Sequence, residues 1–121
     1  MGVEPSEQTF HQRLRGKMDS YVHLVYDLTG KFPSEEKFGV TSQLRRAALS
    51  VVLNYVEGFA RFRSRVNKNF LEISFGSLKE SEYLVDFSSK RGYCSREETV
   101  VIRETAREIG AMLWGILQRI E

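Results

Sequence analysis

Few residues in this chain could perform acid–base, nucleophilic or metal chemistry. It contains two histidines, His11 and His23, and one cysteine, Cys94. Neither histidine follows a glutamate by three residues, so the Glu-x-x-His pattern of a di-metal site in a helical bundle is missing. Cys94 has no histidine near it in sequence to act as a base, and no second cysteine to share a zinc ion or a disulfide. This inventory predicts no catalytic residue, no metal, no cofactor and no enzymatic activity.

A stretch in the middle of the chain, GFARFRSRVNKNF from Gly58 to Phe70, has a composition suited to binding a polyanion. It holds four of the 18 basic residues and none of the 16 acidic ones, so the rest of the chain is slightly acidic although the net charge is +2. A local excess of positive charge is the electrostatic footprint expected for a nucleic acid. The four basic residues are Arg61, Arg63, Arg65 and Lys68.

Other side chains in and before this stretch could contribute to the same surface. Phe59, Phe62 and Asn67 could stack on exposed bases or form hydrogen bonds with them. Arg45 and Arg46, upstream on the same predicted helix, could extend the basic surface. The alternative reading is that cations near a helix C-terminus complement the helix dipole and keep the turn soluble.

Two polar residues, Asn54 and Glu57, lie in the strongly apolar segment SVVLNYVEGFA. A buried amide or carboxylate without a partner costs several kcal/mol, so both are expected to reach a neighbouring helix and to specify packing. Arg45, Arg46 and Lys79 are the candidate partners. We therefore predict structural roles for Asn54 and Glu57.

The elements that position these residues are predicted from the apolar periodicity, which is helical along almost the whole chain. The pattern predicts helices over about 7–29, 41–60, 66–90 and 96–120. Gly30 and Gly92 favour helix ends, and Ser95 with Glu98 is typical of a capping box at the last helix start. Four such helices with short connections predict one domain, residues 1–121, folded as an antiparallel up-down four-helix bundle.

The third predicted helix has more apolar positions than one buried stripe requires. Its apolar residues include Phe70, Ile73, Leu78, Leu84 and Phe87, and the Gly76–Ser77 pair predicts a crowded helix crossing. Consecutive apolar residues in the second and fourth helices add to this excess. The sequence therefore predicts a second buried surface, for which self-association is the commonest use.

No stretch is long and apolar enough to span a bilayer, and the first ten residues lack the plan of a secretory signal. These observations predict a cytoplasmic protein that does not bind membranes.

Several ordered blocks resemble a known family. The segments LVYDLTGKFPSEEKFGVTSQLRRAALSVVLNYVEGFAR, NFLEISFGSLKESEYLVDF and EIGAMLWGIL are similar to the four-helix bundle proteins named for intervening sequences in large-subunit ribosomal RNA genes. Arg45 and Arg46 fall in the family's Leu-Arg-Arg-Ala block, Asn54 and Glu57 in its Asn-x-x-Glu-Gly block, and Arg61 follows as its usual basic residue. In architecture the family is also similar to the accessory variability determinant of diversity-generating retroelements.

The resemblance implies a homopentamer, able to bind RNA or DNA, with no catalytic residues. Together with the basic stretch, it leads to the hypothesis of a non-enzymatic oligomeric bundle that binds nucleic acid through Arg45, Arg46, Arg61, Arg63, Arg65 and Lys68. The alternative is a protein-interaction or scaffold module without nucleic-acid binding, whose basic turn pairs with acidic residues of a protein partner.

Overall fold

The computed structural model of the protein describes residues 9–61 and 63–120. Within these ranges the chain forms four α-helices and two short 3-10 turns, with no strand. The helices are α1 (Phe10–Thr29), α2 (Val40–Phe59), α3 (Ser64–Lys90) and α4 (Val100–Arg119), and the turns are η2 (Ser34–Glu36) and η3 (Glu97–Thr99). The prediction of an all-α fold with four helices is confirmed.

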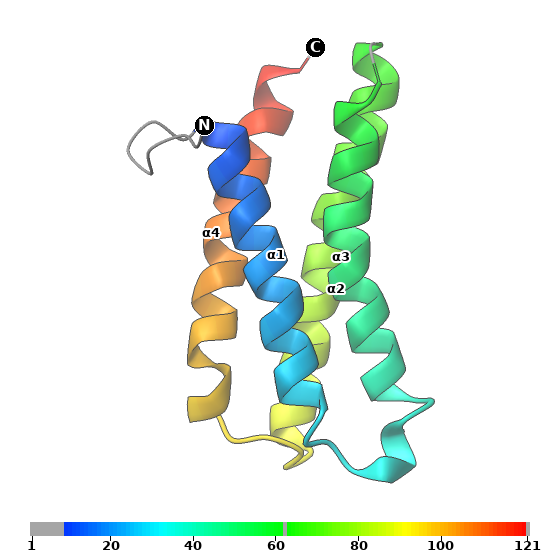
Figure 1. Ribbon diagram of the computed structural model, residues 1–121, viewed down its shortest axis with the longest axis vertical. Coiled ribbons are helices and arrows are strands. Elements are labelled where there is room, and N and C mark those ends of the chain that lie inside the picture. Colours follow the sequence, from blue (N-terminus) through cyan, green and yellow to red (C-terminus); the bar gives the residue numbers. More distant parts are fainter. Residues whose placement is uncertain (1–8, 62, 121) are drawn as a thin grey trace, which may run out of the picture.

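The four helices lie around one core (Figure 1). From its N-terminus α1 runs down the view, α2 returns, α3 runs down again and α4 returns. Each helix packs against its two neighbours in the order α1, α2, α3, α4, and the α2–α3 pairing is by far the most extensive. The α2–α3 turn therefore lies at the same end of the molecule as the start of α1 and the end of α4.

The start of α1 is held by a capping box. The backbone amide of Gln12 donates to Thr9 Oγ1 at 3.1 Å, and the Thr9 amide donates to Gln12 Oε1 at 2.9 Å. These two bonds satisfy donors that have no partner inside a helix, and so place the start at Phe10. Residues 7 and 8, where the predicted helix began, lie outside the described residues.

The predicted capping box before the last helix also forms, but the α-helix starts later than expected. Ser95 N donates to Glu98 Oε1 at 2.8 Å, and Glu98 N donates to Ser95 Oγ at 3.1 Å. The turn that follows is η3, and α4 begins only at Val100. Three-residue 3-10 turns are common at helix N-termini, and their pattern of side chains resembles that of an α-helix too closely for the sequence to separate them.

The core face of α3 does not consist of its most apolar residues. Its buried positions form an alternation of aliphatic residues and serines at a seven-residue repeat, each at most 1% exposed: Leu71, Ser74, Leu78, Ser81, Val85 and Ser88. Of the apolar residues named from the sequence, Leu78 is fully buried, and Leu84 packs against the core. Ile73 and Phe87 are 44% and 38% exposed, while Phe70 and Leu84 are half-buried.

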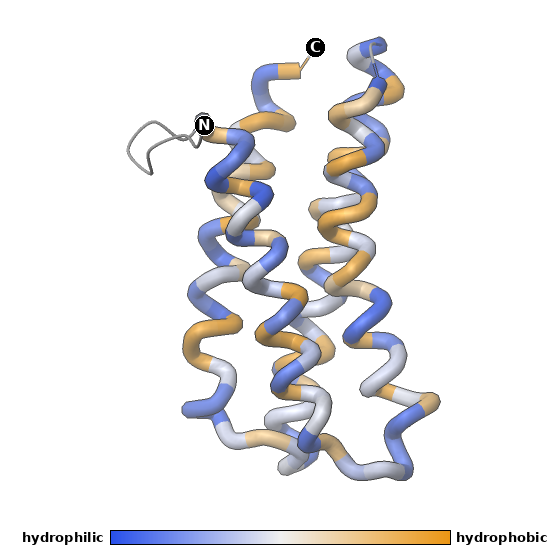
Figure 2. Tube along the Cα trace, in the orientation of Figure 1, coloured by the Kyte–Doolittle hydropathy of each residue, from blue (hydrophilic) through white to orange (hydrophobic). Residues whose placement is uncertain are grey.

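Small serines face the core because neighbouring helices need the space and the hydroxyls find partners there. Ser74 Oγ donates to the carbonyl of Val51 in α2 at 2.7 Å, and Ser88 Oγ donates to Leu84 O at 2.7 Å. A hydroxyl that bonds a carbonyl can be buried at little cost. Figure 2 shows the resulting mixture of hydrophobic and hydrophilic residues along the tube.

The crowded helix crossing lies at Gly58 rather than at Gly76. A Cβ at Gly58 would lie 3.2 Å from a Leu71 methyl and 3.3 Å from both Asn67 O and Phe70 Cβ, whereas a Cβ at Gly76 would meet nothing within 4 Å. The prediction for Gly76 was therefore wrong. The absence of a side chain at Gly58 lets the end of α2 approach the first turns of α3.

No helix in the described ranges is both long and apolar enough to cross a membrane.

Candidate nucleic-acid interface

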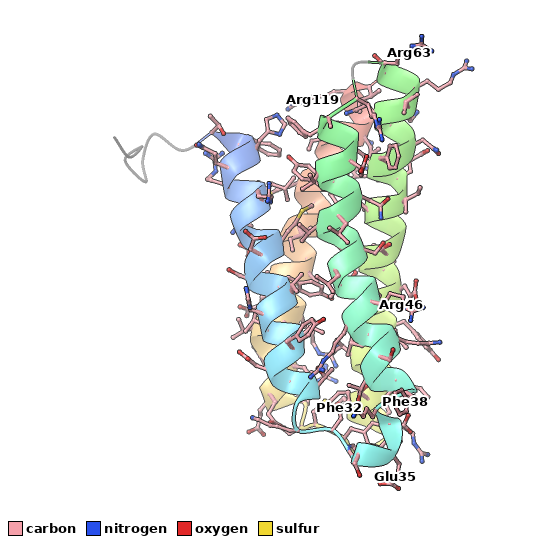
Figure 3. All side chains as sticks on the ribbon, turned by 45° about the vertical axis from the view of Figure 1, so that its right-hand side comes forward. Phe32, Glu35, Phe38, Arg46, Arg63 and Arg119 are labelled. Carbon is pink, nitrogen blue, oxygen red and sulfur yellow. The ribbon has the colours of Figure 1, made fainter. Side chains whose placement is uncertain are left out.

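The basic stretch forms the turn between α2 and α3 and the first turn of α3. Arg63 is the N-cap residue of α3, in an extended conformation, and Figure 3 shows it at the end of the molecule. Arg61, Arg63 and Arg65 are exposed and Lys68 is half-buried. Phe62, which the sequence suggested as a stacking residue, lies outside the described residues.

Close packing beneath this turn holds its shape. The side-chain amide of Asn67 donates to the carbonyl of Gly58 at 2.5 Å, which joins the first turn of α3 to the last turn of α2. Asn67 was predicted as a possible contact to bases, but in this structure its amide nitrogen is used to close the turn. The basic residues therefore project from a connection that is internally bonded.

The electrostatic environment of the turn differs from one arginine to the next. Arg61 Nη2 lies 2.6 Å from Glu57 Oε2, and its guanidinium lies 5.3 Å from the centre of the Phe70 ring. This pairing offsets part of the Arg61 charge. The first turn of α3 contains no acidic residue, and no side chain caps it, so the positive end of its helix dipole adds to the charges of Arg63 and Arg65.

The two residues predicted to reach neighbouring helices behave differently. Glu57 is exposed and pairs with Arg61, which lies two residues beyond the end of its own helix, so the expectation of a partner on another helix is wrong for Glu57. Asn54 is half-buried and donates to the backbone carbonyl and to Oγ of Ser50, both at 2.9 Å. Ser50 Oγ in turn lies 2.7 Å from Ser77 Oγ of α3. Asn54 is thus connected to α3 only through a serine.

Arg45 lies far from the basic turn and is used at the end of α1. Its Nε donates to Thr29 Oγ1 at 2.7 Å, its Nη2 donates to Tyr26 O at 3.4 Å, and its guanidinium lies 4.5 Å from the centre of the Tyr26 ring. A cation at this position complements the negative end of the α1 dipole. Fourteen helical steps of about 1.5 Å, or about 21 Å, separate Arg45 from Phe59 at the end of α2, and Arg61 lies two residues further on.

Arg46 is exposed on the same part of α2, as Figure 3 shows. The six predicted nucleic-acid-binding residues therefore do not converge on one surface of a single chain. Arg61, Arg63, Arg65 and Lys68 gather at one end, and Arg45 and Arg46 lie near the other. The helical rise of about 1.5 Å per residue already separates the two groups along the predicted second helix. What the structure adds is that Arg45 forms its hydrogen bonds at the end of α1.

A groove that the sequence did not reveal lies beside Arg45 and Arg46. Its volume is about 560 Å³, and both arginines line it together with Tyr26, Leu49 and Leu53. Phe38, also in its lining, is 89% exposed. Apolar and cationic side chains both line this groove, which suits an acidic, partly apolar partner better than a neutral one.

A second unexpected feature is an aromatic pocket between the start of α1 and the end of α2, with a volume of about 250 Å³. His11 Nδ1 lies 2.8 Å from the hydroxyl of Tyr55, and the His11 ring meets the edge of Phe59 at a centroid distance of 4.1 Å. Burial lowers the pKa of His11 and raises the pKa of Tyr55 to about 12. A neutral imidazole and a protonated phenol therefore face the pocket at neutral pH.

The other candidates for chemistry have no partners that would activate them. Cys94 is buried, and burial raises the pKa of its thiol, which disfavours the reactive thiolate. His23 is exposed on α1. Within residues 9–61 and 63–120, no cluster of three or more histidine, cysteine, aspartate or glutamate residues is arranged to hold a metal ion.

The helices and the basic turn define the class: an all-α, four-helix protein whose α2–α3 connection is basic. The chain belongs to the 23S rRNA-intervening sequence protein family, because the sequence model of that family matches residues 13–115. The family resemblance seen in the sequence is thereby confirmed.

A solved structure supports the same fold. It is a protein with unknown function from the S23 ribosomal protein family of Bacteroides thetaiotaomicron, with a TM-score of 0.80 and 23% sequence identity. The match covers 87% of this chain and 98% of that one. Likeness at this identity shows the fold alone, and neither description names a catalytic activity. No curated protein matches the chain.

Proposed function

We propose that this protein is a non-enzymatic, antiparallel up-down four-helix bundle that assembles into a homopentamer and binds RNA through the α2–α3 turn. The observation that carries the proposal is the exposure of Arg63 and Arg65 beside the uncapped N-terminus of α3, in a first turn without acidic residues. RNA is the polyanion to test first because the family description names 23S rRNA intervening sequences.

Assembly is part of the proposal because one turn contacts few phosphates. Three exposed arginines and a half-buried lysine give weak binding at cellular salt. When several copies in one assembly bind the same RNA, every contact after the first is intramolecular. The overall affinity is therefore higher than that of one copy. The resemblance to the accessory variability determinant favours five copies.

Exposed apolar residues support self-association. On α2, Leu49, Leu53 and Val56 are spaced by four and three residues and are 37%, 59% and 38% exposed. This spacing places them in one seam, as at the core positions of a coiled coil. On α3, Ile73 and Phe87 are exposed as well. The apolar excess seen in the sequence thus lies on outer helix faces.

Charge reversal at the turn tests RNA binding. The double variant Arg63→Glu, Arg65→Glu should keep its helicity, because acidic residues at a helix N-terminus are favourable. It should lose most affinity for a single-stranded RNA at low salt. The slope of log affinity against log salt should fall by about 1.4 if each arginine contacts one phosphate. Fluorescence anisotropy over a salt series measures both.

The matched control is Arg96→Glu, Arg107→Glu, which changes the net charge equally at two exposed arginines outside the turn. Equal losses of RNA affinity in both double variants would show that binding depends on net charge alone, which would contradict a site at the turn. No retention of RNA or DNA by micromolar wild-type protein at low salt would end the nucleic-acid proposal. Sedimentation tests assembly separately: five copies of the 14.0 kDa chain are expected, and a single-chain mass at all concentrations would refute it.

A protein-interaction module is the alternative, and the groove beside Arg45 and Arg46 favours it. Its occupant would be an acidic, partly apolar segment of a partner protein. Wild-type binding to such a partner that is lost in Leu53→Glu and kept in Arg63→Glu, Arg65→Glu would support the alternative, provided RNA binding is absent.

A further inference from the structure

The aromatic pocket and the basic turn lie at the same end of the bundle. Phe59 is the last residue of α2, and Arg61 follows two residues later, so their Cα atoms are within about 7.6 Å of each other. His11, across the pocket, is in the first turn of α1. Figure 1 shows the start of α1 beside the ends of α2 and α4. The pocket is therefore within reach of a strand whose phosphates contact the turn.

Aromatic surface is available in the pocket. The Phe59 side chain is 48% exposed although it contacts both His11 and Tyr55, with ring centroids 4.1 Å and 5.2 Å away. The two neighbours hold the Phe59 ring in place while leaving part of it open. A half-exposed aromatic ring that is held in this way offers a flat surface on which a base can stack at little cost in side-chain entropy.

Polar groups and a cation complete the lining. Gln12 and Tyr55 line the pocket, and the Tyr55 hydroxyl is hydrogen-bonded to His11 Nδ1. Arg15 also lines it, with its side chain 54% exposed and its Nε at 4.0 Å from Asp19. Arg15 therefore lies in the α1 wall of the pocket, and the basic turn follows Phe59, the last α2 residue of its other wall. A small aromatic surface with one arginine in its lining and a basic turn close by in the chain suits a base with its flanking phosphates.

We propose that this pocket takes one unpaired nucleobase of the nucleic acid whose phosphates contact the basic turn. The proposal rests on the proposed function and deepens it, since it makes single-stranded or bulged segments the preferred ligand. Phe59 stacks on the base, and Arg15 contacts a neighbouring phosphate. The volume of the pocket, about 250 Å³, admits one base and no more than part of a nucleoside.

A second copy of the chain is the other possible occupant. The apolar seam of Leu49, Leu53 and Val56 on α2 offers three exposed apolar side chains for such a contact, and only Val56 among them lines the pocket. An apolar side chain from a second copy would leave Arg15 without a negative partner beyond Asp19. The charges around the pocket therefore favour the nucleic acid.

The test compares two variants that remove a half-exposed or exposed phenylalanine ring and keep an apolar side chain. Phe59→Leu changes the pocket, and Phe38→Leu changes the 89% exposed ring near the other end of the bundle. The probes are a fluorescein-labelled 12-nucleotide single-stranded RNA, a 12-base-pair duplex and an abasic 12-mer of the same charge. Affinity is measured by anisotropy at low salt, with helicity and oligomeric mass recorded for each variant.

Wild-type protein should prefer the single strand to the abasic strand by at least about fivefold, the lower end of aromatic stacking on a base. Phe59→Leu should remove this preference and leave duplex binding unchanged, and Phe38→Leu should behave as wild type. Equal wild-type affinity for the single and abasic strands would overturn the pocket proposal while the proposed function stands. A lower oligomeric mass of Phe59→Leu would assign the pocket to a subunit contact and overturn it too. If no probe binds, both fail.

Discussion

The hydroxyls of Tyr21 and Ser81 lie 2.7 Å apart in the centre of the bundle, where both residues are fully buried. Ser81 Oγ also donates to Leu78 O at 2.7 Å, which uses its one hydrogen, so Tyr21 is the donor in the pair. Tyr21 belongs to α1 and Ser81 to α3, which lie diagonally across the core. The bond therefore fixes the register of two helices that are not neighbours in the ring of four.

Removing the serine should cost more than removing the tyrosine hydroxyl. Ser81→Ala leaves the Tyr21 hydroxyl buried without an acceptor, which should lower the free energy of unfolding by about 1–3 kcal/mol. Tyr21→Phe leaves Ser81 with its bond to Leu78 O and should cost about 0.5–1.5 kcal/mol. Urea denaturation of both variants and the double variant measures this. A larger loss for Tyr21→Phe than for Ser81→Ala would contradict the assigned direction of the bond.

Two glycines of the α2–α3 hairpin should respond to alanine in opposite ways. Gly58→Ala puts a methyl within 3.3 Å of Asn67 O and Phe70 Cβ, and should destabilise the protein by about 1–3 kcal/mol. Gly76→Ala meets nothing within 4 Å in the middle of α3 and should stabilise it by about 0.5–1 kcal/mol. Melting temperatures should therefore move in opposite directions. A shift of the same sign in both would show that the crossing is not tight at Gly58.

The neighbours Arg45 and Arg46 should separate structural and surface roles. Arg45→Ala removes the bonds to Thr29 and Tyr26 at the end of α1, and should cost about 1 kcal/mol of stability. Arg46→Ala changes an exposed side chain and should stay within about 0.5 kcal/mol. Chemical denaturation gives both values. Equal stability of the two variants would count against a structural role for Arg45.

The bond between Tyr93 and Glu36 should make stability depend on pH. The Tyr93 hydroxyl donates to Glu36 Oε2 at 2.8 Å, and this bond, followed by the Val40 amide, holds the pKa of Glu36 below its ordinary 4.5. A lowered carboxyl pKa contributes stability that is present above the ordinary value and lost as the pH falls through the folded value. Tyr93→Phe should thus melt below wild type at pH 7, with the difference shrinking below pH 4.5.

Tyr83→Phe is the control, because that ring is 65% exposed on α3. Melting temperatures of the three proteins from pH 7 to pH 3 give the comparison. A difference between Tyr93→Phe and wild type that stays constant over this range would mean that the bond does not act through the ionisation of Glu36.

Features that depend on residues close together in the sequence were predicted correctly. The Ser95–Glu98 box and the helix ends near Gly30 and Gly92 depend on bonds between residues a few positions apart. The core face of α3 could not be predicted from hydrophobicity, because Ile73 and Phe87 are more apolar than Ser74 and Ser81 and yet are exposed while the serines are buried. The serines are buried because partners on other helices, Val51 and Tyr21, accept or supply hydrogen bonds there.

The sequence by itself determined four helices, the family and a basic α2–α3 connection, since periodicity, caps and charge are local properties of the chain. Only the tertiary structure decided which face of α3 is buried and which glycine lies at the crossing. It also decided that Arg45 of α2 bonds to the end of α1. It also brought His11 to Phe59, 48 positions apart in sequence, beside the basic turn. Such relationships depend on how helices pack across the core, and helical spacing along one chain segment does not specify them.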